Sequence, residues 1–125
     1  MFKIGIPPYL ECSTKGDKRF SPFYAKPSIL KGMSIEEFYH AFKIFNDGST
    51  SLSWRDAKNK KRDGFFVINQ EKCNIIYSSL WDFYIKENPE LLKVLKKQTG
   101  LSDIFGNENG PCQAKELWRI RNENA

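Results

Sequence analysis

Apolar side chains recur at the spacing of an α-helix between residues 34 and 46. They fall on one stripe of such a helix: Ile35, Phe38, Ala41, Phe42 and Phe45. Ser34 and Glu37 have the spacing of a capping box, in which the hydroxyl accepts from the Glu37 amide and the carboxylate accepts from the Ser34 amide. Gly48 provides a stop signal. The pattern predicts a helix from Ser34 to Asn46, and we expect the rest of the chain to be organised around it.

A neighbouring stripe of the same predicted helix carries three ionisable side chains. Glu36, His40 and Lys43 follow one another at i, i+4 and i+7. Because Glu37 belongs to the capping box, Glu36 is left without a structural role. Two interpretations are open at this point. The row is either a solvated stripe whose contacts contribute only ~0.2–0.5 kcal/mol each, or one wall of a cleft.

Four more helices are predicted from periodicity and from start and stop signals. They are expected at residues 53–61, at 70–87, from 89 to a stop at Gly100, and from Pro111 onward. Ser53 and Asn88 are good N-cap residues for the first and third of these helices. In the last helix, Ala114, Leu117 and Trp118 are expected to face inward.

The strand signals are short and lie mostly near the N-terminus. Residues 2–6 alternate apolar and polar before a Pro-Pro pair, which favours an edge strand, and residues 9–12 suit a second one. Residues 65–68 fit either a strand or the approach to a helix, whereas residues 101–110 are polar and glycine-rich and predict a loop. The expected fold is a mainly α-helical α+β domain that spans residues 1–125 as one unit.

The composition of the chain indicates which kinds of partner it binds and in which cell compartment it is expected. A formal charge of +5 favours polyanions, either nucleotides or nucleic acids, and the basic run at residues 58–62 is either a solvated face or a steering patch. Three cysteines without paired short spacing predict reduced thiols, no zinc site and a cytoplasmic protein. No apolar run is long enough for export or for a membrane span. We expect no metal and no cofactor.

Two polar segments carry candidate binding chemistry. In residues 13–19, Arg19 could fork to a phosphate while Lys15 adds charge, although a mobile surface loop has the same composition. In the predicted loop at 101–110, Asp103, Phe105 and Asn107 supply a carboxylate, an aromatic ring and an amide within five residues. The alternative for these three is that they cap turns or fill the core.

Five segments, in order, resemble the blocks of the NADAR (YbiA-like) superfamily. They read FSPFYA at 20–25, EEFYHAFKIF at 36–45, NPELL at 88–92 with TG at 99–100, DIFG at 103–106 and LWRIR at 117–121. Aligned on Ala41 and Lys43, the family's helix glutamate falls on Glu36. His40 replaces the usual glutamine, and Phe105 stands one position before the expected tryptophan. Residues 10–19 also resemble small phage and bacterial proteins of this group.

The resemblance implies a domain that cleaves an N-glycosidic bond to a ribose, either in ADP-ribosylated guanine of a nucleic acid or in a ribosylamino-pyrimidine nucleotide. We expect Glu36 to stabilise the cationic sugar or activate water, Asp103 to be its partner carboxylate, and Lys43 to be a nucleophile or a phosphate ligand. The expected substrate contacts are Lys15, Arg19, Phe20, Ser21, His40, Trp54, Phe105, Asn107 and Gln113. The competing hypotheses are a protein that binds an ADP-ribose-like nucleotide or a nucleic acid without turnover, and an interaction protein without a ligand.

Overall fold

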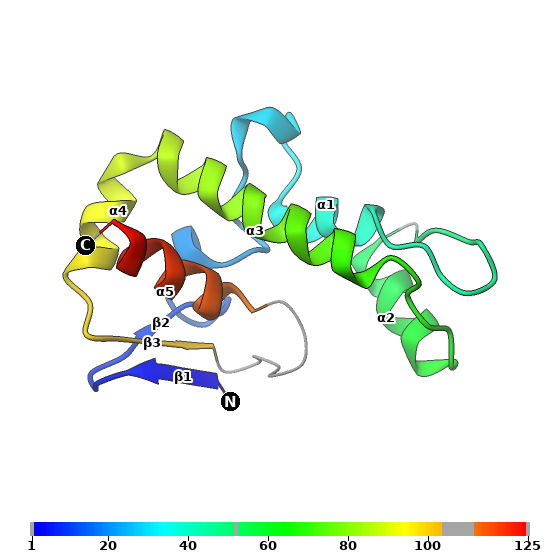
Figure 1. Ribbon diagram of the computed structural model, residues 1–125, viewed down its shortest axis with the longest axis horizontal. Helices are drawn as coiled ribbons and strands as arrows, with labels where there is room; N and C mark the ends of the chain where they lie inside the picture. The colour runs from blue at the N-terminus through cyan, green and yellow to red at the C-terminus, as the bar shows by residue number, and fades with distance from the viewer. Residues whose placement is uncertain (1, 52, 104–111, 125) are drawn as a thin grey trace.

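The computed structural model describes residues 2–51, 53–103 and 112–124, and it shows a three-stranded sheet with helices on one side (Figure 1). The strands are β1 (Phe2–Gly5), β2 (Leu10–Glu11) and β3 (Gly100–Asp103). The helices are α1 (Ile35–Ala41), α2 (Trp54–Arg62), α3 (Gln70–Glu87), α4 (Pro89–Lys96) and α5 (Gln113–Glu123), and short 3-10 turns cover Lys18–Phe20 and Ser28–Leu30. The predicted α+β class is confirmed.

The middle strand of the sheet is β3, which the sequence predicted as part of a loop. It pairs antiparallel with β1, Phe2 opposite Asp103, and parallel with β2, Leu10 opposite Leu101. All four of its residues are buried. The loop prediction is therefore wrong for residues 101–103, because the polar side chains that suggested it find buried partners: the Ser102 hydroxyl donates to a Glu11 carboxylate oxygen at 3.0 Å.

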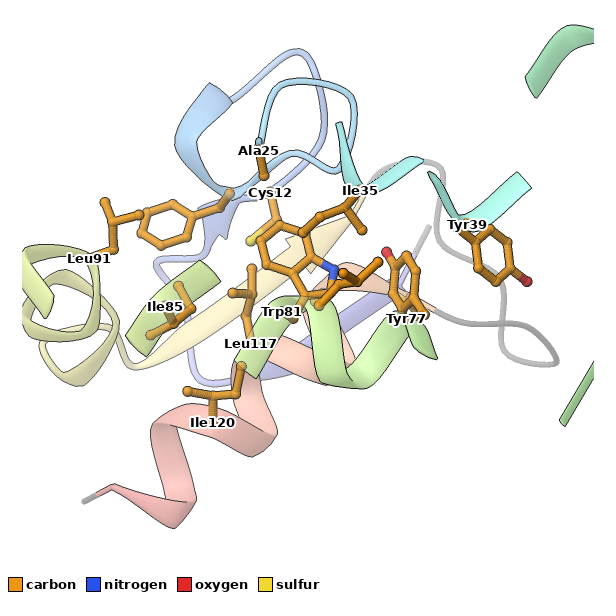
Figure 2. Close-up of a cluster of buried hydrophobic side chains, with 14 of the residues drawn as sticks. Cys12, Ala25, Ile35, Tyr39, Tyr77, Trp81, Ile85, Leu91, Leu117 and Ile120 are labelled. Atoms are coloured by element: carbon orange, nitrogen blue, oxygen red, sulfur yellow. The ribbon is translucent and has the colours of Figure 1, made fainter. Parts of the chain in front are cut away.

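Helix α3 is the centre of the hydrophobic core (Figure 2). Its buried face consists of Cys73, Tyr77, Leu80, Trp81 and Ile85. This face contacts α1, α4 and α5, and α5 in turn packs on β1 and β3. The predicted helix at residues 70–87 is confirmed, and its Trp81 is fully buried at the centre of the cluster.

Helix α1 ends five residues earlier than predicted. Its last residue is Ala41, and Phe45 instead forms an isolated β-bridge with Val67 and donates its amide to the Ser49 carbonyl at 3.0 Å. The apolar stripe also differs from the prediction, because Ala41 is exposed while Tyr39 is buried. The spacing of Phe45 matched a helix by coincidence, since its burial comes from a pairing more than 20 residues away.

The starts of α2 and α4 agree with the prediction, but only one of the two predicted cap residues forms its cap. Helix α2 begins after Ser53, whose hydroxyl accepts from the Asp56 amide at 3.1 Å, as predicted. Helix α4 begins at Pro89 as predicted, but Asn88 does not cap it, because its side-chain amide donates to the Tyr84 carbonyl at 2.8 Å. Gly100 does not end α4 directly: it is the first residue of β3.

Residues 44–69 form a separate lobe at the end of the molecule away from the sheet (Figure 1), and we call this segment the α2 lobe. Phe45 and Ala57 are buried within it but are not part of the main core cluster. The sequence allowed two interpretations of residues 65–68, a strand or the approach to a helix. In the structure they run beside residues 44–46, and Val67 forms an isolated β-bridge with Phe45. Within the described ranges, no helix has both the length and the apolar character needed to cross a bilayer.

Gly5 and Gly64 offer a matched test of how the sheet packs against α5. Both have φ of +86°, but a side chain at Gly64 would enter open space, whereas one at Gly5 would collide with the Thr99 carbonyl and the Trp118 ring. We expect Gly64→Ala to lower the free energy of unfolding by about 1 kcal/mol, from backbone strain alone. Gly5→Ala should lower it by at least about 2 kcal/mol more, measured by urea denaturation. Equal losses would contradict the close packing at Gly5.

Candidate active site

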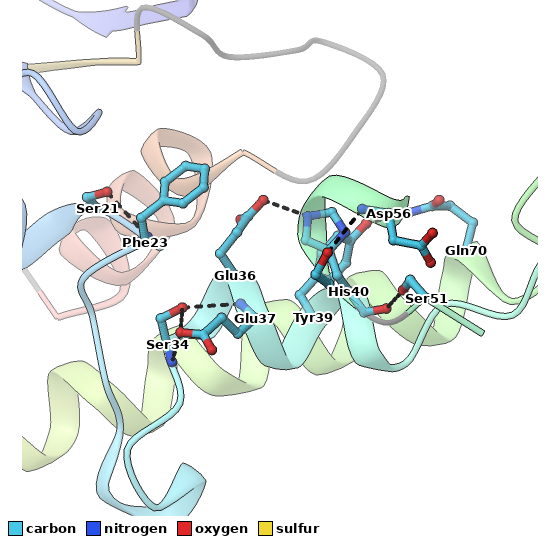
Figure 3. Close-up of polar contacts among 11 residues, drawn as sticks. Ser21, Phe23, Ser34, Glu36, Glu37, Tyr39, His40, Ser51, Asp56 and Gln70 are labelled. Carbon is cyan, nitrogen blue, oxygen red and sulfur yellow. Dashed lines mark hydrogen bonds and ion pairs between the residues drawn. The ribbon is translucent and has the colours of Figure 1, made fainter. Parts of the chain in front are cut away.

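The start of α1 is fixed by its capping box, drawn in Figure 3, and by backbone hydrogen bonds to the segment at residues 22–25. The Glu37 amide donates to the Ser34 hydroxyl at 3.2 Å, and a Glu37 carboxylate oxygen accepts from the Ser34 amide at 3.4 Å, so the predicted capping box is confirmed. The amides of Ile35 and Glu36 donate to the carbonyls of Ala25 and Pro22, each at 2.9 Å. These bonds pair the amide groups of the first turn, which a helix cannot satisfy itself.

Glu36 and His40 form a short contact on this helix. The Glu36 carboxylate lies 2.7 Å from His40 Nε2, and the two side chains are only 19% and 11% exposed. His40 Nδ1 is buried and has no hydrogen-bond partner among the described residues. The predicted i, i+4 row is thus a largely buried acid–imidazole pair whose second imidazole nitrogen is buried without a partner among the described residues.

Lys43 joins this pair although it lies beyond the end of α1. The residue is buried, and its Nζ lies 4.7 Å from the centre of the Tyr39 ring. The pKa of Lys43 is lowered to about 8, chiefly by burial and also by the positive charge of Lys61, whereas the negative charge of Glu36 opposes both. A substantial fraction of this amine is therefore neutral near physiological pH, which is the form that can act as a nucleophile or a base.

Two tyrosines complete the surroundings, and sequence reasoning missed both. The rings of Tyr39 and Tyr77 are 5.2 Å apart at their centres, and the Tyr39 hydroxyl accepts from the Gln70 side-chain amide at 2.9 Å. Burial raises the pKa of Tyr39 to about 12. Burial also raises the pKa of Tyr77 well above its ordinary value, and the charges of Glu36 and Asp103 act in the same direction. The one signal in the sequence was that both core positions carry a tyrosine, with its hydroxyl, where a purely apolar residue such as leucine would also fill the space.

Asp103 and Gln113 lie in a second buried polar group where β3 ends and α5 begins. The Cys112 thiol donates to an Asp103 carboxylate oxygen at 3.7 Å, and Asp103 is only 3% exposed. Gln113 donates its side-chain amide to the Cys12 carbonyl at 3.3 Å. Because the charges of Glu36 and Asp103 both influence the Tyr77 phenol, this group and the Glu36 pair lie within electrostatic range of one tyrosine.

The residues expected to bind phosphate, Lys15 and Arg19, lie on the turn at residues 13–19. The Arg19 guanidinium forms a two-pronged contact with the Asp17 carboxylate, at 2.7 and 3.0 Å, and the Tyr84 hydroxyl donates to the Arg19 carbonyl. Lys15 is exposed in the preceding turn, while Phe20 and Ser21 are fully buried. The charged and titratable groups that act on Arg19 are Asp17, Tyr84 and Glu90. Its phosphate contact stays a prediction.

Three of the expected substrate contacts fall outside what the structure describes. Phe105 and Asn107 lie outside the described residues. Trp54 is the first residue of α2, but its side chain is not among those described. Among the described residues, no three His, Cys, Asp or Glu side chains are close enough together to hold a metal ion.

Two hollows flank the segment that carries the site. One, of about 380 Å³, lies on the Glu37 side of α1 and is lined by Phe23, Met33, Ser34, Glu37, Ala41, Ser51 and Ser53. The other, of about 400 Å³, is lined by Lys61, Phe65, Phe66, Val67 and Gln70. Gln70 connects the second hollow to the site, because its side chain donates to the Tyr39 hydroxyl. Neither of these two hollows is lined by Glu36, His40 or Lys43, and Gln70 is the residue that links the second one to Tyr39.

Comparison of the chain with models of protein families, with curated proteins and with solved structures gave no match.

Lys43→Met tests whether the buried amine costs stability. Below pH 8 both the folded and the unfolded chain carry the proton, so folding must bury the charge at full cost; between about 8 and 10.5 the folded state releases the proton first, and the cost fades. We expect the variant to be more stable than wild type by about 2 kcal/mol near neutral pH, and the gain to disappear by about pH 10.5.

Urea denaturation of both proteins across this pH range measures the difference, and Lys72→Met provides the control, because Lys72 is exposed on α3. A gain for Lys43→Met that does not change with pH would show that the amine is not the source of the cost.

Proposed function

We propose that this protein hydrolyses the C1′–N bond of a ribosylated base, of the ADP-ribosyl-guanine type or the ribosylamino-pyrimidine type, with Glu36 as the central carboxylate. The observation that carries the proposal is the short, largely buried contact of Glu36 with His40, beside a lysine whose pKa is lowered to about 8. A carboxylate, an imidazole and an amine that are close together and shielded from water are typical of sites of acid–base and nucleophilic catalysis.

The chemistry assigns each group a role. As the C1′–N bond breaks, its electron pair leaves with the base, and positive charge develops on C1′ and the ring oxygen. A carboxylate at Glu36 stabilises that charge and accepts a proton from the water whose oxygen bonds to C1′. The departing base takes up a proton, so the sum is addition of one water. His40 holds the Glu36 carboxylate in place through the 2.7 Å contact.

Lys43 serves this reaction through its lowered pKa. In its protonated form the amine binds a phosphate of the substrate, and in its neutral form it can attack C1′ directly. The resemblance of residues 36–45 to the helix block of the NADAR superfamily supports the assignment, because the family's glutamate falls on Glu36. Cys12, Cys73 and Cys112 are free thiols, in keeping with the cytoplasmic location that we propose.

One observation favours a second candidate, a protein that binds an ADP-ribose-like nucleotide without cleaving it. Asp103, the expected partner carboxylate, is almost completely buried and accepts from the Cys112 thiol. A glycosidase needs its second carboxyl group at the substrate. Without that group, a bound nucleotide would stay intact.

Glu36→Gln tests the catalytic assignment, with Glu37→Gln as a matched control one residue away. The substrates are an oligonucleotide carrying ADP-ribosylated guanine and a ribosylamino-pyrimidine phosphate, and the release of free base is followed by chromatography and mass spectrometry. We expect Glu36→Gln to lower kcat by at least about 100-fold on the substrate that wild type cleaves. Glu37→Gln should stay within about twofold of wild type, because glutamine also completes a capping box.

Equal rates for Glu36→Gln and wild type would refute the assignment. A wild-type protein that retains intact ribosyl nucleotide for hours would instead establish the second candidate.

A further inference from the structure

The positive charge of the molecule is concentrated on one short helix. Five of the nine residues of α2 are lysine or arginine and one is aspartate, so this helix carries four of the five net positive charges of the chain. Those charges are Arg55, Lys58, Lys60, Lys61 and Arg62, against Asp56. Figure 1 places α2 at the end of the molecule opposite α4.

Three of these cations form one exposed row. Lys60 turns inward, where its Nζ donates to the Ser49 hydroxyl at 2.6 Å and the Thr50 carbonyl at 2.8 Å. Lys58, Lys61 and Arg62 are exposed and form no ion pair with any described residue. Their spacing of i, i+3 and i+4 puts them on the same face of α2, where like charges repel one another. A polyanion relieves that repulsion.

Aromatic surface lies beside this row. Phe66 is 72% exposed, and Lys61, Phe65, Phe66 and Gln70 line the same hollow of about 400 Å³. Ile68, which is 65% exposed, continues the apolar surface. One hollow thus offers a cation, two phenyl rings and a hydrogen-bonding amide, all drawn from the α2 lobe and the first residue of α3.

We propose that this face, formed by Lys58, Lys61, Arg62, Phe65 and Phe66, binds single-stranded nucleic acid. The row of cations contacts successive phosphates, and an unpaired base enters the hollow and stacks on Phe66. A duplex would satisfy the cations but keeps its base faces stacked inside. An anionic bilayer would also satisfy the cations and the exposed apolar residues, but the hollow, with two phenyl rings and an amide in its wall, favours a flat base that stacks and forms hydrogen bonds.

This binding goes beyond the proposed hydrolysis and does not require it. The face adjoins the Glu36 site through Gln70, which lines the hollow and donates to Tyr39. Unmodified strands, which carry neither an ADP-ribosyl group nor a ribosylamino-pyrimidine, therefore test the face alone. Failure of binding and failure of hydrolysis are then separate results.

The experiment measures fluorescence anisotropy of unmodified DNA and RNA single strands of about 20 nucleotides with the full chain, between about 50 and 200 mM NaCl. The test variant replaces Lys58, Lys61 and Arg62 by alanine, and the control replaces Lys93, Lys96 and Lys97, which are exposed at the opposite end of the chain's fold. Both variants lose three positive charges. We expect the test variant to lose at least about tenfold in affinity and about two units of the log–log salt slope, whereas the control stays within about twofold.

A second pair of variants isolates stacking. Phe66→Ala should weaken binding by about tenfold without changing the salt slope, because no charge is lost. Ile29→Ala removes an apolar side chain that is 61% exposed in the 3-10 turn Ser28–Leu30, which bonds to Glu87 at the far end of α3 from Gln70, and it should have no effect. Circular dichroism confirms that each variant is folded.

Several results would overturn the proposal. Equal losses in the two triple variants would mean that only net charge matters. Duplex DNA bound as tightly as single strands would exclude stacking on Phe66. Binding to vesicles of phosphatidylserine and phosphatidylcholine, without binding to either strand at the lowest salt, would assign the face to a membrane surface instead.

Discussion

The position of Glu36 depends on how the amide groups at the start of α1 are satisfied. A helix of seven residues is too short to be stable by itself. Its first-turn amides are bonded to the carbonyls of Pro22 and Ala25 and to the Ser34 hydroxyl. Ser21, Pro22 and Ala25 are buried, so the segment that accepts these bonds is itself fixed by the core. The carboxylate is therefore held by backbone from another part of the chain as firmly as by its own helix.

Local signals predicted where helices begin, and tertiary contacts decided where several of them end. The capping box at Ser34, the cap at Ser53 and the proline at the start of α4 act within four residues, so the sequence displays them directly. The end of α1 is set instead by the pairing of Phe45 with Val67. Strand β3 was missed for the same reason, since its partners in β1 lie almost 100 residues earlier and bury polar side chains that look like those of a loop.

The candidate site shows the same division between near and distant contacts. Glu36 and His40 could be paired from the sequence because helical geometry places i and i+4 side by side. The sequence placed Lys43 near Glu36 by assuming that the helix continues through residue 43, and this assumption is wrong because α1 ends at Ala41. Lys43 still lies close to the pair, because its amine packs on the Tyr39 ring. Tyr77 could not be assigned, because the charges of Glu36 and Asp103 act on it only when α3 packs against both α1 and α5.

The basic helix and the buried amine are electrostatically coupled. The positive charge of Lys61 helps to lower the pKa of Lys43, and Lys61 also lines the hollow on the α2 lobe. A phosphate bound at Lys61 would offset that charge and raise the pKa of Lys43. By linkage, protonation of Lys43 must then strengthen the binding of the phosphate by the same free energy. A nucleic-acid strand bound to the α2 lobe would therefore favour the protonated form of Lys43, which is the form that binds a phosphate. Burial would then be the main remaining cause that lowers the pKa of Lys43.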